Sequence, residues 1–189
     1  MKTEGTPKEK LFQTAARLFY QNGYRAVGVD TIASESGIGK MTLYRHYPSK
    51  DDLITAYLQD SNQLFWHQFE QITKDIPSAR QKLLAFFEAL QSYALTPVCF
   101  GCPFINVAAE YPEPEYIGHQ VALEHKQSVL ARFRQLAEEA GASQPDALAA
   151  ALFLLMDGGY VAARMFGAST NSPVANLAEA ARHMIDAYC

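Results

Sequence analysis

The sequence predicts an all-α protein with an N-terminal three-helix domain and a larger helical body. Apolar residues recur at helical spacing along most of the chain, and no segment alternates as a half-buried strand does. The expected helices begin at Thr, Ser or Pro and end at Gly or Pro, which are common helix start and stop signals. We expect the domain boundary near residue 60, so that the domains comprise residues 1–60 and 61–189.

The first helix is expected from Thr6 to about Asn22. Thr6 can cap the helix, Pro7 suits the first helical position, and Glu9 stands three residues after the cap. Gly23 ends the helix. Its apolar stripe should pack across the two helices that follow, so we interpret its phenylalanines as scaffold. The stripe comprises Leu11, Phe12, Ala15, Ala16, Leu18 and Phe19.

Residues 28–50 read as two short helices joined by a sharp turn. Gly37 can adopt the left-handed conformation that ends the first of them. In the second, expected at about 40–47, Leu43 and Tyr47 are four residues apart and can share a buried face. The pattern is that of a helix-turn-helix.

The remaining side chains of this segment suit DNA. Lys and Arg neutralise phosphates or contact guanine, Thr can meet a thymine methyl group or a phosphate, and Tyr and His offer donors to backbone oxygens. A compact helical hairpin with a solvated charged face is the alternative, and composition alone leaves both open. The candidate DNA-binding residues are Thr31, Lys40, Met41, Thr42, Tyr44, Arg45, His46 and Lys50.

The segment resembles the DNA-binding signature of the tetracycline-repressor (TetR) family of bacterial transcription regulators. The resemblance covers roughly residues 6–60 and rests on Ile32-Ala33, Gly37-Ile38, Thr42-Leu43-Tyr44, His46-Tyr47 and Ser49-Lys50. It implies an N-terminal helix-turn-helix DNA-binding domain, a C-terminal helical domain for ligand binding and dimerisation, and repression by a dimer on a pseudo-palindromic operator.

Three positions depart from the family pattern. Gly28 and Gly39 stand where the family usually has a Ser or Thr helix cap, a replacement that costs only a few tenths of a kcal/mol. Met41 stands where a small residue is common. Because Met41 lies on the expected reading face, we expect it to affect operator sequence.

Composition limits the class of protein. With 189 residues, 49% of them hydrophobic, the chain can bury one substantial core and at most one small appended domain. It has no run of eighteen apolar residues and no signal-peptide pattern, so we expect a soluble cytoplasmic protein without membrane contact. Three cysteines, an odd count, argue against a secreted disulfide framework.

Charge is unevenly distributed along the chain. Residues 1–50 contain eight Lys or Arg and four Asp or Glu, a balance of +4, whereas the whole chain carries −4. The other 139 residues therefore carry −8. A basic head on an acidic body favours an orientation with the head on DNA, since phosphate attraction does not depend on base sequence.

Six further helices are expected in the body. The first would leave the DNA head and enter the body, which gives events in the body a mechanical route to DNA. The last two suggest a homodimer seam once the family layout is added, with an intramolecular core as the alternative. The ranges are about 50–72, 79–95, 103–109, 115–140, 145–167 and 172–188.

Aromatic residues are concentrated in the middle of the chain, where the resemblance implies a cavity for a small-molecule effector. Aromatic residues at helical spacing are more often core than pocket. The candidate ligand-binding residues are Phe65, Trp66, Phe69, Phe87, Phe104, Asn106, Asp157 and Tyr160.

Cys99 and Cys102 offer a second possible input. Cys102 should stand at the start of the helix that Pro103 opens, where the helix dipole stabilises a thiolate, and Cys99 is close enough in sequence to form a disulfide with it. Plain packing is the leading alternative. No second CxxC completes a metal site, and we expect no metal or cofactor.

Two other functions remain open. One is a small all-helical enzyme with Cys102 as nucleophile and His119 or His125 as base, although no spacing fixes such a pair. The other is a helical interaction protein that carries a motif-like hairpin. We expect no catalytic site.

Overall fold

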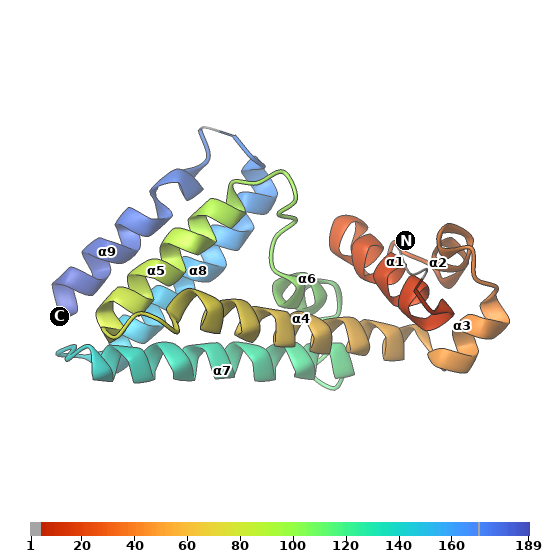
Figure 1. The fold of residues 1–189 in the computed structure, drawn as a ribbon, viewed down its shortest axis with the longest axis horizontal. Coiled ribbons are helices and arrows are strands. Elements are labelled where there is room, and N and C mark those ends of the chain that lie inside the picture. Colours follow the sequence, from red (N-terminus) through yellow and green to blue (C-terminus); the bar gives the residue numbers. More distant parts are fainter. Residues whose placement is uncertain (1–4, 170) are drawn as a thin grey trace. The chain divides into compact units, whose positions relative to one another are not determined.

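The protein is described from a computed structural model that covers residues 5–169 and 171–189. Within these ranges it is all-helical and contains no strand, as predicted (Figure 1). The elements are α1 (Pro7–Asn22), α2 (Val29–Ser36), α3 (Lys40–His46), α4 (Lys50–Thr73), α5 (Ala79–Ala94), α6 (Pro103–Glu110), α7 (Ile117–Glu139), α8 (Pro145–Phe166), a 3₁₀ helix η1 (Pro173–Asn176) and α9 (Leu177–Tyr188).

The predicted cap of α1 is present. The Thr6 side chain accepts a hydrogen bond from the Glu9 amide, and the Glu9 carboxylate accepts one from the Thr6 amide at 2.7 Å. Helix α1 contacts both α2 and α3, so it is the scaffold of the head. Buried side chains of the head, from α1 to the first half of α4, include Leu11, Leu18, Phe19, Tyr24, Ile32, Leu43, Leu53, Ile54 and Leu58.

Side-chain caps also begin α4 and α5. The Ser49 hydroxyl accepts a hydrogen bond from the Asp52 amide at 3.0 Å, and the Asp52 carboxylate accepts one from the Ser49 amide at 2.9 Å. At the start of α5, Ser78 accepts a hydrogen bond from the Gln81 amide. The sequence therefore encodes these helix boundaries locally.

The C-terminal helix differs from the prediction. A single helix was expected from Ser172 onward, but Pro173–Asn176 forms a 3₁₀ turn before α9 begins at Leu177. Ser172 caps this turn by accepting a hydrogen bond from the Val174 amide. Short 3₁₀ segments are frequent at helix ends, and hydrophobic spacing does not separate them from α-helix.

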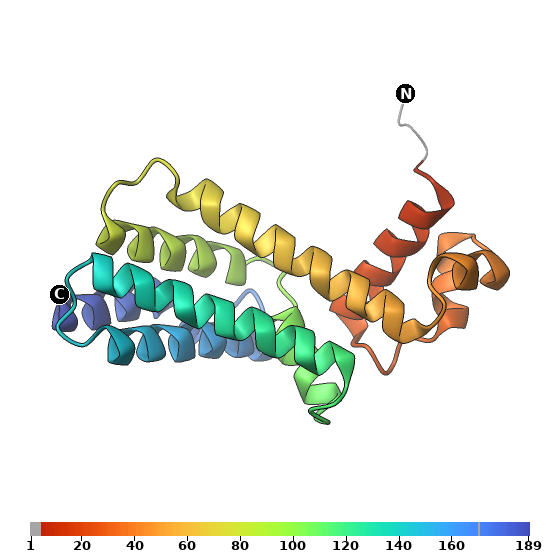
Figure 2. The ribbon, with the colours of Figure 1, turned by 90° about the horizontal axis from the view of Figure 1, so that it is seen from below.

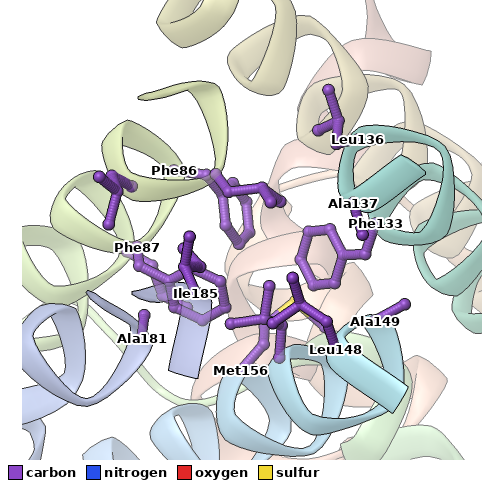
Figure 3. Close-up of a cluster of buried hydrophobic side chains, with 14 of the residues drawn as sticks. Phe86, Phe87, Phe133, Leu136, Ala137, Leu148, Ala149, Met156, Ala181 and Ile185 are labelled. Atoms are coloured by element: carbon purple, nitrogen blue, oxygen red, sulfur yellow. The ribbon is translucent and has the colours of Figure 1, made fainter. Parts of the chain in front are cut away.

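Helices α5, α8 and α9 lie side by side (Figure 1) and, with the C-terminal part of α7, enclose one aromatic and aliphatic core. Phe86 is central to it: its ring centroid lies 5.3 Å from that of Phe87 and 5.4 Å from that of Phe133. Met156 and Ile185 close the cluster from α8 and α9 (Figure 3). The double phenylalanine thus fills a core that several helices share.

The chain forms two compact units. One comprises the N-terminal stretch up to Asn62 together with Pro103–Leu123, and the other comprises Gln63–Cys102 and Glu124–Cys189. Below we call them the head unit and the body unit. Helix α4 is continuous, as Figure 2 shows, and contributes its first half to the head unit. The division into 1–60 and 61–189 stays a prediction.

Helix α8 leaves one apolar side uncovered by the rest of the chain. Leu154, Val161 and Met165 are 69%, 43% and 75% exposed. By length and composition alone α8 could also cross a membrane, a test that core helices of soluble proteins pass as well. This side of α8 is therefore an exposed apolar strip of the described structure.

Candidate nucleic-acid interface

The turn between α2 and α3 requires a glycine. Gly37 has φ +69°, a left-handed conformation that side chains with Cβ disfavour. The Gly37 amide donates to the Ser34 carbonyl at 3.3 Å, and the Ile38 amide donates to the Ala33 carbonyl at 3.2 Å. These bonds satisfy carbonyls at the end of α2 and redirect the chain into α3.

Burial divides α3 into an inner and an outer side. Leu43 is fully buried and the Tyr47 side chain that follows the helix is 7% exposed, as the four-residue spacing predicts. Desolvation raises the pKa of Tyr47. Met41 is 89% exposed and Tyr44 is 47% exposed. Helix α3 thus presents a continuous outer side to the solvent.

The predicted DNA-binding residues fall into two groups by exposure. Thr31, Lys40, Met41, Tyr44 and Arg45 are exposed, whereas Thr42, His46 and Lys50 are half-buried. All eight belong to the head unit. Their contacts with DNA remain a prediction.

Two head cations already have acidic neighbours. Lys40 pairs with Asp30 of α2, and Arg17 of α1 pairs with Glu35 of α2. Both pairs are largely exposed, and pairs of this kind contribute about 0–1 kcal/mol. The Lys40 ammonium can therefore exchange its carboxylate partner for a phosphate at little cost.

Lys50 sits in a more enclosed position at the start of α4. Burial lowers the pKa of Lys50, while the neighbouring Asp51 and Glu110 carboxylates raise it. Glu110 comes from the end of α6, sixty residues further along the chain. A carboxylate near a candidate phosphate ligand limits how strongly that lysine attracts DNA.

Sequence reasoning missed the contribution of α6 to the head. The Glu110 carboxylate accepts hydrogen bonds from the Tyr24 and Arg25 amides, at 2.9 and 2.6 Å, in the turn between α1 and α2. The Tyr116 hydroxyl donates to the Asp51 carboxylate at 2.8 Å. The sequence shows residues 111–114 only as a helix break, and no periodicity or motif indicates that their neighbours reach the head.

Comparisons with known proteins, by sequence and by structure, find the same arrangement in a family of DNA-binding regulators. Residues 11–57 match the family described as bacterial regulatory proteins, tetR family. SCO4454, a TetR-family transcriptional regulator of Streptomyces coelicolor, superposes with a TM-score of 0.91 at 30% identity, over 96% of this chain and 95% of that one. The chain belongs to the TetR family. The expected resemblance and fold are thereby confirmed.

Two curated relatives match less than half of the chain. The HTH-type transcriptional regulator SAB2452 of Staphylococcus aureus is 37% identical over 71 residues, which is 38% of each chain. The HTH-type transcriptional repressor KstR2 of Mycolicibacterium smegmatis is 32% identical over 88 residues, 44% of this chain and 43% of that protein. The matches thus span about two fifths of the length of each of these relatives.

The candidate ligand-binding residues are divided between the units of this TetR-family protein. Phe104 and Asn106 lie on α6 in the head unit, and the other six lie in the body unit. Phe69 and Phe87 are buried in the aromatic core, at 3% and 0% exposure, which is the packing alternative. The Phe65 and Trp66 rings meet edge to face at 5.2 Å.

Asp157 and Tyr160 are near neighbours on α8 in the body unit. Asp157 pairs with Lys126, whose ammonium also lies 5.5 Å from the centre of the Phe153 ring. Burial raises the pKa of Tyr160 well above its usual value, and the nearby Cys102 thiol adds to that effect. Tyr160 is thus a neutral phenol that can donate a hydrogen bond within an apolar setting.

Neither Cys99 nor Cys102 forms a disulfide, and both are buried, at 7% and 4% exposure. As predicted, Cys102 directly precedes the first residue of α6. Burial restricts access of reagents to a thiol, and structural buried cysteines are usually inert. Packing explains both residues at least as well as redox sensing.

The two histidines considered as catalytic bases have other roles. The Nδ1 atom of His119 lies 3.1 Å from the Tyr111 carbonyl oxygen. The His125 ring is buried edge-on against Phe65 at 4.9 Å, and burial lowers its pKa to about 3, which makes it a weak base. Across the described ranges, no group of three or more His, Cys, Asp or Glu residues could hold a metal.

The buried His125 predicts pH-dependent stability. Burial, and then the Lys126 charge, lower the pKa of His125 from 6.5 to about 3. Between about pH 6.5 and pH 3, His125 is therefore protonated in the unfolded chain and neutral in the folded chain. We expect the free energy of unfolding to fall as pH drops from about 6.5 towards 3, by at most about 1.4 kcal/mol per pH unit.

Chemical denaturation across this pH range checks the prediction. His125→Gln should flatten the pH dependence, whereas His67→Gln, a matched change at an exposed position, should retain it. Equal pH dependence in the wild type and the His125 variant would contradict the assignment.

Proposed function

We propose that the protein is a DNA-binding transcriptional regulator, a repressor that binds a pseudo-palindromic operator as a homodimer in the cytoplasm. The observation that carries the proposal is the division of α3 into a buried side, with Leu43 and Tyr47, and an exposed side, with Met41 and Tyr44. The name of the mycobacterial relative, a transcriptional repressor, supports the direction of control.

In this proposal α3 enters the major groove. A helix with its side chains is about 10–12 Å wide, which matches a groove of about 12 Å. Lys40 and Arg45 contact phosphate or guanine, while Met41 and Tyr44 meet base edges or the thymine methyl group. Met41, the most exposed of these large side chains, would set operator preference.

The homodimer would form through α8 and α9. Counted from Ala150, the residues four, eight, eleven and fifteen positions further along α8 lie on the same side of the helix. The side chains on this side are apolar or small, which allows a second helix to approach closely. Covering this side with a second copy removes exposed apolar surface without any other partner. The strip comprises Ala150, Leu154, Gly158, Val161 and Met165.

A small-molecule effector would act through the body unit and α4. The candidates that keep partial exposure there are Phe65, Trp66, Asp157 and Tyr160. Because α4 runs from the head unit into the body unit as one helix, a shift of its body half would turn its head half. The half-site spacing of a dimer would then change. Trp66, the single tryptophan of the chain, offers a fluorescence signal for effector screening.

Two alternatives remain testable. A thiol-reactive effector would act on Cys102 with Cys99 as its partner, which their burial disfavours. An enzyme using Cys102 would need a base, and the low pKa of His125 makes that histidine unsuitable. The regulator names of the relatives also favour DNA binding over catalysis.

DNA binding predicts distinct effects of three substitutions. Lys50→Ala should weaken binding to all sequences and reduce the steepness of log K against log salt by about 1. Met41→Ala should change the preferred bases instead. Lys74→Ala, which removes an exposed lysine of the body unit, should alter neither. Selection from random DNA measures the preferred bases, and titrations at several salt concentrations measure the affinity and its salt dependence. If all three variants had the base preference and the affinity of the wild type, the proposal would be refuted.

The dimer predicts that Leu154→Glu produces monomers. Burying an unpaired carboxylate between two copies costs several kcal/mol, enough to dissociate a typical dimer. Leu64→Glu introduces the same charge at a site of similar exposure on α4 and should remain dimeric. Sedimentation velocity distinguishes the two, and a dimeric Leu154 variant would exclude this interface.

The thiol alternative predicts that hydrogen peroxide or N-ethylmaleimide releases operator DNA from the wild type but not from Cys102→Ser. Cys189→Ser is the control, since Cys189 is exposed at the C-terminus. Unchanged binding after treatment of the wild type would leave packing as the role of Cys102.

A further inference from the structure

A carboxylate from α6 holds the turn between α1 and α2. Glu110 accepts hydrogen bonds from two consecutive amides, those of Tyr24 and Arg25, at 2.9 and 2.6 Å. Hydrogen bonds to an ionised acceptor are about twice as strong as neutral ones. Gly23 permits this approach, because a Cβ there would lie 2.7 Å from the Glu110 Oε1 atom.

Side chains reinforce the same contact. The Tyr24 hydroxyl donates to the Pro103 carbonyl at 2.9 Å, and the Arg25 guanidinium lies 4.7 Å from the centre of the Tyr111 ring. Tyr24 is 1% exposed, so its hydroxyl needs this partner. The whole turn is therefore held from both ends of α6.

The segment after α6 holds the start of α4 as well. The Tyr116 ring stacks on Tyr111 at 4.2 Å, and its hydroxyl donates to the Asp51 carboxylate. Residues 103–116 thus contact the chain on both sides of the helix-turn-helix: before α2, at residues 24 and 25, and after α3, at residue 51. All these residues belong to the head unit.

Resting on the proposed function, we propose that Glu110 is a positioning residue for DNA recognition. Its carboxylate fixes the turn before α2, while the Tyr111–Tyr116 stack fixes the start of α4, and together they set the position of α3 against the groove. Recognition of base edges depends on such positioning to within about 0.5 Å, whereas phosphate attraction tolerates more. Glu110 itself carries negative charge and need not touch DNA.

Glu110→Gln tests the contact with little change in shape. A carboxamide has one acceptor oxygen, so its NH₂ group would face one of the two backbone N–H donors, and at least one hydrogen bond is lost. Glu115→Gln is the matched control, because it removes the same charge from an exposed position in the adjoining loop. Loss of negative charge alone would strengthen phosphate attraction.

The experiment uses the full chain and an operator selected with the wild type. We expect Glu110→Gln to bind this operator about tenfold more weakly than Glu115→Gln, with equal binding to random DNA, because one or two charge-assisted hydrogen bonds are lost. Amide exchange measured by NMR should rise at Tyr24 and Arg25 in the Glu110 variant alone. Glu110→Asp keeps the negative charge but shortens the side chain by one methylene, and it should weaken operator binding as well. This variant replaces Glu110→Gln in the experiment if Glu110→Gln does not fold.

The outcomes separate the two proposals. A wild type that selects no DNA sequence would overturn the proposed function and, with it, the role of Glu110. A wild type that selects an operator, with Glu110 variants that bind it as Glu115→Gln does, would overturn the positioning role alone. Faster amide exchange without loss of operator affinity would assign Glu110 to stability only and would also overturn the inference.

Discussion

The burial of Leu43 and Tyr47 determines which side of α3 faces the solvent, and the proposed DNA contact depends on it. A seven-residue helix has little stability of its own, so its orientation comes from these two inward side chains and from α1 beneath them. The left-handed Gly37 sets the angle at which α3 leaves α2. Rotation of α3 by one residue, about 100°, would turn other side chains outward in place of Met41 and Tyr44.

Two cations of the head form weak ion pairs with carboxylates, which DNA phosphates could replace. Lys40 and Arg17 pair with carboxylates in largely exposed positions, where an ion pair contributes little. Lys50 lies in a more enclosed site next to Asp51 and Glu110. The excess of positive charge in residues 1–50 therefore overstates the number of cations that are free of acidic neighbours in the folded chain.

The body unit combines a closed aromatic core with one open helix side. Phe86, Phe87 and Phe133 interlock around α5 and α7, which gives the body a rigid centre. Outside it, α8 exposes a strip of apolar side chains, which the proposed homodimer would cover with a second copy of the chain. The Lys126–Asp157 pair and the neutral Tyr160 place polar groups near this core, where an effector could be oriented.

The sequence by itself determined the helices, the reading motif and the family, because caps, glycines and hydrophobic spacing act within a few residues. Thr6, Ser49 and Gly37 have the roles that their local patterns predict. The 3₁₀ turn at Pro173–Asn176 was not predicted, because the spacing of its apolar residues resembles that of an α-helix. Tertiary structure alone decided that Lys40 pairs with Asp30, that Phe69 and Phe87 fill the core, and that Glu110 reaches Tyr24. Glu110 and Tyr24 are 86 positions apart, and packing in three dimensions brings them together, which no local pattern encodes.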